Sequence, residues 1–179
     1  VGFDFQTLKQ IIKMAQTLLR GNPVTTAGEL PAVGSSAPAF TLVNAQLGEV
    51  QLSDFAGKKV VVSMFPSIDT PTCATSTRKF NQEVTAHPGI NVVTVSADLP
   101  FALTRFCAAE GIENVHTLSS FRSSFGADYG MNLTDGPLAG VLARGVLVID
   151  EAGKVIHSEL VNNISDEPNY AAVLSALGV

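Results

Sequence analysis

Residues 60–73 read VVVSMFPSIDTPTC and join a strand-like run to the start of a helix. Residues 60–65 are largely apolar and rich in β-branched side chains, which predicts a strand buried on both faces. A proline ends this run. Thr70 then suits a helix N-cap, and Pro71 suits the first helical position, where its missing N–H is no loss. The pattern therefore places Cys73 in the first turn of a helix that follows a central strand.

The position of Cys73 has a chemical consequence. Unpaired backbone N–H groups and the helix dipole favour a thiolate over a thiol at a helix start, and the thiolate is the nucleophilic form. Thr77 and Phe80 follow on the same helical face, so we expect Cys73 to face inward at the floor of a pocket. The alternative is a small buried hydrophobe, which is the usual role of a lone cysteine on an apolar helix face.

Length and composition narrow the class of protein. The chain has 179 residues, 46% of them hydrophobic and 15% charged, which is typical of one globular domain. A net charge of −5 with scattered basic residues makes nucleic acid an unexpected partner. The apolar runs are too short for a membrane span, and no signal peptide is evident. The two cysteines are therefore expected to start reduced in a cytoplasmic setting, where cysteines more often serve chemistry than structure.

The order of predicted elements indicates the fold class. The strand, helix and strand expected over residues 60–96 form a parallel crossover unit. Asp98 is expected to cap the helix that follows, and Gly111 to end it. The other predicted elements are hairpins at 17–26 and 39–52, a strand at 114–118, a helix at 121–129, a strand at 143–149 paired with 155–159, and a helix at 168–177. This order predicts an α/β fold with a mixed central sheet flanked by helices.

Residues 1–13 are treated separately from this domain. Their apolar positions recur every three or four residues, so a short amphipathic helix is plausible. We expect an N-terminal extension of unknown role over 1–13, with Met14 as a candidate natural start, and a single domain over 14–179. The alternatives for 1–13 are an interface helix or a targeting arm.

The motif at residues 66–73 resembles the active-site motif of peroxiredoxins: proline, three residues, threonine, two residues, cysteine. Two further stretches resemble the bacterial thiol peroxidases, an atypical two-cysteine subfamily. One runs from SADLPFA at residues 96–102 to Cys107, and the other from DGPLAG at residues 135–140 to Arg144. Residues 21–25 resemble the N-terminal hairpin of that subfamily, and the resemblance extends from about residue 17 to the end.

The resemblance implies a thioredoxin-like (peroxiredoxin) fold with an N-terminal β-hairpin and an antioxidant peroxidase activity. Cys73 would attack hydrogen peroxide or an organic hydroperoxide, and Cys107 would condense with the resulting sulfenic acid to a disulfide. Thr70 and Arg144 match the family positions that orient the peroxide and stabilise the departing oxygen, and Pro66 matches the residue that shields the pocket. The resemblance also implies recycling by a thioredoxin-like reductant, and a homodimer.

Without the resemblance, each residue has a plainer interpretation. Arg144 would as readily be a solvated surface arginine, Thr70 only an N-cap, and Cys107 an inert helical cysteine. The pairing of Cys73 with Cys107 rests on the resemblance alone. Because both cysteines are expected on helices, that disulfide predicts local unwinding of one or both helix ends when it forms.

Other chemistries have little support in the sequence. The three histidines lie far apart without metal-ligand spacing, and no glycine-rich nucleotide loop is present, so neither a metal nor a cofactor is expected. A disulfide exchange catalyst is disfavoured because there is no C-x-x-C. The alternative function from another class is a thioredoxin-fold redox sensor or binding protein, which would consume about one peroxide equivalent per chain without turnover.

Overall fold

A seven-stranded mixed sheet runs through the part of the chain that the computed structural model describes, residues 13–179 without the side chains at 84 and 85. Its strand order is β4-β3-β7-β6-β5-β8-β9. The strands are β3 (Thr41–Val43), β4 (Glu49–Gln51), β5 (Lys59–Met64), β6 (Ile90–Ser96), β7 (Val115–Ser119), β8 (Gly145–Ile149) and β9 (Val155–Leu160). The helix and the extension predicted for residues 1–13 lie outside the described residues, Lys13 excepted.

The centre of the sheet follows the predicted crossover. β5 and β6 pair in parallel and are joined by α1 (Pro71–Ala86), and β6 and β7 pair in parallel around α2 (Pro100–Glu110). β8 lies antiparallel to β5 and is followed by β9 on the outer side. The mixed sheet is therefore confirmed. β5 lies between β6, which follows it closely in sequence, and β8, which is far from it in sequence.

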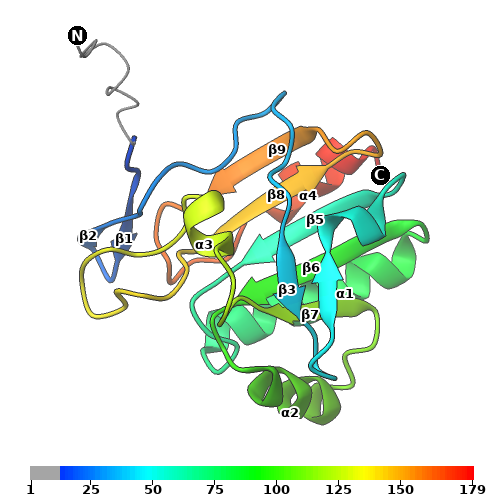
Figure 1. Ribbon diagram of the computed structural model, residues 1–179, viewed down its shortest axis with the longest axis horizontal. Helices are drawn as coiled ribbons and strands as arrows, with labels where there is room; N and C mark the ends of the chain where they lie inside the picture. The colour runs from blue at the N-terminus through cyan, green and yellow to red at the C-terminus, as the bar shows by residue number, and fades with distance from the viewer. Residues whose placement is uncertain (1–12) are drawn as a thin grey trace, which may run out of the picture.

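The N-terminal hairpin is also confirmed. β1 (Gln16–Leu19) and β2 (Asn22–Thr25) pair antiparallel in a separate small sheet, seen at one end of the molecule in Figure 1. Arg20 and Gly21 both have positive φ, of 51° and 83°, which is the backbone of a tight hairpin turn. The hairpin is tied to the domain because the Ile164 N–H donates to the Leu18 carbonyl.

Helices cover the two faces of the sheet unequally. Side chains from α1, α2 and α4 (Tyr170–Leu177) pack on one face with Val61, Val92 and Val146. The short α3 (Phe125–Asp128) packs on the other face, where Phe125 and Tyr129 stack. Figure 1 shows α4 behind β8 and β9, and α3 in front of the sheet. Both faces of the central strands are thus removed from solvent, as their apolar sequences predict.

Two local predictions were wrong. The helix expected over 121–129 is confined to α3, because Ser120 and Phe121 are held by bonds to Ser96 and Ser119 instead of helical partners. Asp98 does not cap α2: the N-cap is Leu99, without a side-chain bond. The carboxylate of Asp98 accepts other hydrogen bonds, and Gly111 ends α2 in the left-handed conformation as expected.

Gly130 permits its backbone to lie in close contact with the backbone of Glu29. Its φ is +67°, and a Cβ at this position would overlap the backbone of Glu29, lying 2.6 Å from the Glu29 nitrogen. The carbonyl of the next residue, Met131, accepts a hydrogen bond of 2.8 Å from the Ala143 N–H. The segment at Gly130 is therefore also bonded to the residues that lead into β8. We expect Gly130→Ala to lower the free energy of unfolding by about 2–5 kcal/mol, through left-handed strain and overpacking.

The control for this prediction is Gly153→Ala. Gly153 has a φ of +80° but nothing within 4 Å of an added Cβ, so only the backbone strain of about 1–2 kcal/mol is expected. Urea unfolding of both variants measures the difference. Equal destabilisation would contradict the role assigned to the contact between Gly130 and Glu29.

Candidate active site

Cys73 lies in the first turn of α1 and is fully buried, with 0% of its surface exposed. It packs in a small cluster with Phe65, Ile68 and Leu103. β5 ends just before this cluster, so the strand end, the loop of residues 66–70 and the helix start converge on the sulfur. The position in the first turn agrees with the sequence prediction, and the surroundings of the sulfur are apolar except for two donors.

Thr70 supplies the first donor and also begins the helix. Its carbonyl accepts the first helical bond, from the Ala74 N–H at 3.0 Å. Its hydroxyl lies 2.7 Å from Cys73 Sγ and 3.0 Å from the Ser67 carbonyl oxygen. A hydroxyl carries one proton, so Thr70 donates to the sulfur when the sulfur is a thiolate and to the carbonyl otherwise. The backbone and the side chain of Thr70 therefore perform different tasks.

Arg144 supplies the second donor. Its Nη2 lies 3.2 Å from Cys73 Sγ, and its Nε donates to the Ile164 carbonyl oxygen at 2.7 Å. Only 3% of Arg144 is exposed, so the interpretation as a solvated surface arginine is wrong. The sheet register explains the contact: Gly145 pairs with Met64, which places the preceding residue beside the end of β5.

The charge of Arg144 acts on two side chains near the start of α4, Glu167 and Tyr170. Hydrogen bonds from Lys79 and then Tyr170 hold the pKa of Glu167 below its usual range, and the charge of Arg144 lowers it further. Burial and the bond to Glu167 raise the pKa of Tyr170, which therefore stays a neutral donor. The guanidinium thus has a carboxylate in its vicinity besides the sulfur that it contacts.

The five residues that the sequence singled out are only partly brought together. Thr70 and Arg144 both contact Cys73, and Pro66 is buried at the end of β5, where the loop to α1 begins. Cys107 lies in the last turn of α2, half-buried, with its Sγ 3.4 Å from Thr117 Oγ1. Both cysteines are free, and each sulfur has its own polar neighbours.

Cys107 lines a separate hollow of about 380 Å³ with Thr104, Glu113 and His116 among others. Burial and the nearby charge of Lys58 lower the pKa of His116. His116 is therefore neutral at pH 7 and adds no positive charge beside Cys107. The sulfur of Cys107 is therefore next to solvent-accessible space, whereas the sulfur of Cys73 is enclosed.

Sequence reasoning missed Asp98 as part of this region. Its carboxylate accepts bonds from Ser67, Ile68 and Ser96, all at the carboxyl ends of β5 and β6. The available signal was its place just after a parallel strand, since the carboxyl ends of neighbouring parallel strands share one sheet edge.

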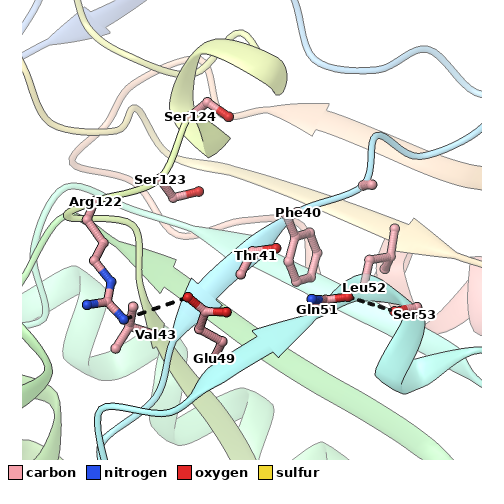
Figure 2. A pocket seen from close by; sticks show the side chains of 11 residues that line it. Phe40, Thr41, Val43, Glu49, Gln51, Leu52, Ser53, Arg122, Ser123 and Ser124 are labelled. Atoms are coloured by element: carbon pink, nitrogen blue, oxygen red, sulfur yellow. Dashed lines mark hydrogen bonds and ion pairs between the residues drawn. The ribbon is translucent and has the colours of Figure 1, made fainter.

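A larger open hollow of about 560 Å³ lies elsewhere, between β3, β4 and the segment Arg122–Ser124. Figure 2 shows Arg122 reaching toward Glu49 there, at 3.9 Å, with Phe40 and Gln51 along the opposite side. Its lining includes neither cysteine, so we do not place the chemistry in it. Among the described residues no three His, Cys, Asp or Glu side chains are grouped to share a metal ion. Within the same residues, no helix combines the length and apolar character needed to cross a membrane.

Comparisons with known proteins agree with this geometry. Residues 32–174 match the Redoxin family model. The thiol peroxidase of Mycobacterium tuberculosis (strain ATCC 25618 / H37Rv) is 56% identical over 165 residues, which are 92% of this chain and 99% of that protein. The thiol peroxidase of Corynebacterium glutamicum is 54% identical over 164 residues, with coverages of 92% and 99%.

Two solved structures have the same fold. A peroxiredoxin-like protein from Aquifex aeolicus has a TM-score of 0.87 at 41% identity, covering 93% of this chain and 98% of that one. A thiol peroxidase from Chromobacterium violaceum has a TM-score of 0.86 at 23% identity, covering 93% and 97%, and supports the fold alone. The predicted thioredoxin-like, peroxiredoxin-type fold is thus confirmed. The chain belongs to the Redoxin family and is a peroxiredoxin-type peroxidase, an oxidoreductase related over most of its length to the thiol peroxidases.

Proposed function

We propose that the chain reduces hydrogen peroxide and organic hydroperoxides by an atypical two-cysteine cycle in which Cys73 is the peroxidatic residue. The Cys73 thiolate attacks one peroxide oxygen, the S–O bond forms and the O–O bond breaks. The departing oxygen takes a proton and leaves as water or an alcohol, and Cys73 becomes a sulfenic acid. The single observation that carries this proposal is the convergence of two hydrogen-bond donors, from Thr70 and Arg144, on one buried sulfur.

The two donors suit different moments of this step. Before peroxide arrives, both donors contact the sulfur and fix its position in the pocket. Once peroxide is bound, the planar guanidinium of Arg144 can donate to the oxygen on which negative charge develops, and it stays protonated at any working pH. The Thr70 hydroxyl can orient the attacked oxygen. Pro66, buried beside the loop, keeps water from competing with the bound peroxide.

The second step joins the sulfenic acid to Cys107. The Cys107 thiol attacks the Cys73 sulfur, a disulfide forms and water leaves. A disulfide requires Cα atoms within about 7 Å of each other, and both cysteines lie in helical turns. One or both helix ends must therefore open, namely the first turn of α1 at Cys73 and the last turn of α2 at Cys107. The half-buried Cys107 makes the last turn of α2 the end where opening is measured.

A thioredoxin-like reductant would then return both cysteines to thiols by thiol–disulfide exchange. We also propose a homodimer in a cytoplasmic setting. Leu99, Phe101 and Phe121 support the dimer: they are 50%, 66% and 44% exposed, and their segments are joined by the bond from Ser120 to Ser96. Large apolar side chains exposed close together are typical of a protein interface.

The disulfide step is tested with Cys107→Ser. Wild type treated with one equivalent of peroxide is expected to lose two hydrogens by mass spectrometry, with a peptide that links Cys73 to Cys107. Cys107→Ser is expected to be oxidised at Cys73 at a similar rate but to stop at the sulfenic acid, which dimedone traps. It should lose nearly all turnover with a thioredoxin system, because the reductant then lacks a disulfide substrate.

Amide exchange gives a second measurement of this step. The last turn of α2 should lose protection in oxidised wild type and keep it in peroxide-treated Cys107→Ser. Turnover of Cys107→Ser at the wild-type rate, or unchanged protection on oxidation, would contradict the resolving role of Cys107.

A further inference from the structure

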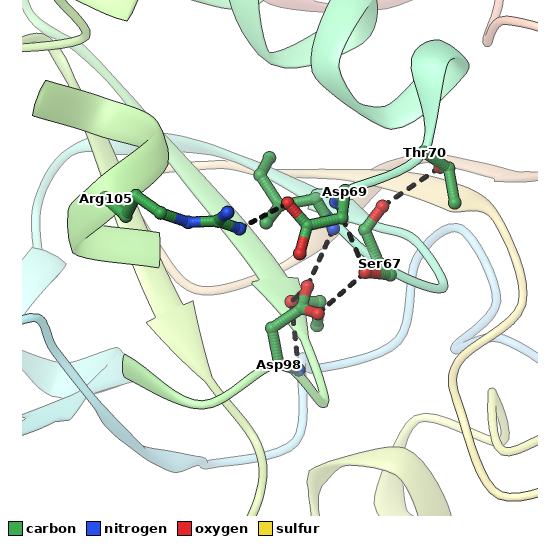
Figure 3. A network of polar contacts seen from close by, with 7 residues as sticks. Ser67, Asp69, Thr70, Asp98 and Arg105 are labelled. Carbon is green, nitrogen blue, oxygen red and sulfur yellow. Dashed lines mark hydrogen bonds and ion pairs between the residues drawn. The ribbon is translucent and has the colours of Figure 1, made fainter. Parts of the chain in front are cut away.

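The carboxylate of Asp98 binds the loop that leads to Cys73. Its Oδ1 accepts the Ser67 hydroxyl at 2.7 Å, and its Oδ2 accepts the Ile68 N–H at 2.7 Å and the Ser96 hydroxyl at 2.6 Å. Figure 3 shows Asp98 on one side of the loop, with bonds running to Ser67 and to the backbone that follows. One side chain from the end of β6 thus binds consecutive residues of the loop after β5.

These bonds continue to the sulfur through two further contacts. The Ser67 carbonyl, part of the residue that Asp98 binds, accepts the Thr70 N–H at 3.1 Å and faces the Thr70 hydroxyl at 3.0 Å. That hydroxyl in turn contacts Cys73 Sγ at 2.7 Å. The location of the Thr70 hydroxyl therefore depends on where Asp98 holds Ser67.

The two carboxylate oxygens are the acceptors for this whole set of partners. Three donors converge on them, from Ser67, Ile68 and Ser96. An alanine at position 98 offers no acceptor, so the Ile68 N–H and the two hydroxyls would lose these bonds and the loop would be free to move. An asparagine is a milder change, because its NH₂ group can donate to the Ser67 hydroxyl, which accepts as well as donates.

We propose that Asp98 is a positioning residue for peroxide reduction: through Ser67 it fixes the Thr70 hydroxyl at the distance from Cys73 that orients the bound peroxide. The inference rests on the proposed function of Cys73. Asp98 touches neither the sulfur nor the substrate, so its loss should affect a reaction that needs the oriented hydroxyl more than one that needs only a nucleophilic sulfur.

The test compares Asp98→Ala and Ser67→Ala with wild type. Asp69→Ala is the matched control, since Asp69 is on the same loop but forms an exposed ion pair with Arg105 at 2.6 Å. Two rates are measured at Cys73: oxidation by hydrogen peroxide, followed by dimedone trapping, and alkylation by iodoacetamide. Thermal unfolding is recorded for each variant, and amide exchange reports the protection of the Ile68 N–H.

Asp98→Ala is expected to lower the peroxide rate between about 10-fold and 100-fold, the range expected when a reacting group is misplaced by a fraction of an ångström to one ångström. Ser67→Ala should lower it less, because Asp98 still binds Ile68. Alkylation should change far less in both variants, since Arg144 still donates to the sulfur. The Ile68 N–H should exchange faster in Asp98→Ala, which removes its acceptor, and Asp69→Ala should behave as wild type.

A wild-type peroxide rate in Asp98→Ala would overturn the proposal. An equal fall in the peroxide and iodoacetamide rates would also overturn it, because that is the result of general loosening. If peroxide fails to oxidise wild-type Cys73 at all, the proposed function is wrong, whatever the variants show. In that case the amide exchange rate of the Ile68 N–H still shows whether Asp98 fixes the loop.

Discussion

Cys73→Ser is expected to reduce peroxide consumption to the background rate, while Cys107→Ser keeps the first oxidation. A serine hydroxyl at this position would still accept the bonds from Thr70 and Arg144, so the pocket should keep its shape. It cannot replace the sulfur chemically, because attack on the O–O bond needs the thiolate and its accessible higher oxidation state. The loss should therefore come without a change in the thermal unfolding midpoint.

The measurement is peroxide consumption with a thioredoxin system, with wild type, Cys73→Ser and Cys107→Ser side by side. Many equivalents consumed per chain by wild type support an enzyme, whereas about one equivalent would favour the redox-sensor alternative. Activity retained in Cys73→Ser would contradict the assignment of Cys73 and remove the basis of the proposed cycle.

Arg144→Met is expected to have the second largest effect, a fall of about 100-fold to 1,000-fold in the rate of Cys73 oxidation. That range is the cost of removing one preorganised donor from a site where charge develops in the transition state. Methionine keeps much of the side-chain volume at a position that is only 3% exposed, so packing is largely preserved. The rate of sulfenic acid formation after rapid mixing with peroxide measures the effect.

Two variants control this prediction. Arg144→Lys keeps a charge but cannot bind the Ile164 carbonyl and the sulfur in the same fork, so an intermediate rate is expected. Arg122→Met removes an exposed arginine beside the open hollow at β3 and β4 and should oxidise as wild type. Oxidation of Arg144→Met at the wild-type rate would show that the guanidinium does not assist the reaction.

Local chemistry explains which parts of the site could be read from the sequence. The strand before Pro66, the helix start after Thr70 and the first-turn position of Cys73 depend on neighbouring residues, and each agrees with the structure. The Thr70 hydroxyl, which was expected to cap the helix, instead contacts Cys73 Sγ and the Ser67 carbonyl oxygen. The motif also identified Arg144, but its burial follows from the pairing of β8 with β5, which local patterns do not specify. Asp98 was misassigned because an aspartate before a helix usually caps it, and here tertiary hydrogen bonds compete successfully for the carboxylate.

Cys107 marks the limit of such reasoning. Its place in the last turn of α2 could be predicted from helix-end signals, namely the glycine at 111. Its neighbours Thr117 and His116 lie on strand β7, outside the helix itself. No local sequence pattern therefore indicates that the sulfur would lie beside a hollow. The role of Cys107 therefore still rests on the proposed cycle and its test.

The insertion of β8 beside β5 also bears on how the protein is made. The guanidinium of Arg144 and the sulfur of Cys73 are 71 positions apart, so the ribosome synthesises the cysteine well before its partner. At about 5–20 residues per second, that interval is about 4–14 s, to which transit through the exit tunnel is added. During this time the nascent chain carries Cys73 without its cationic donor. Under the proposed mechanism, the sulfur would become fully reactive toward peroxide only once the last third of the chain has docked, so peroxide reactivity would be a late reporter of completed folding.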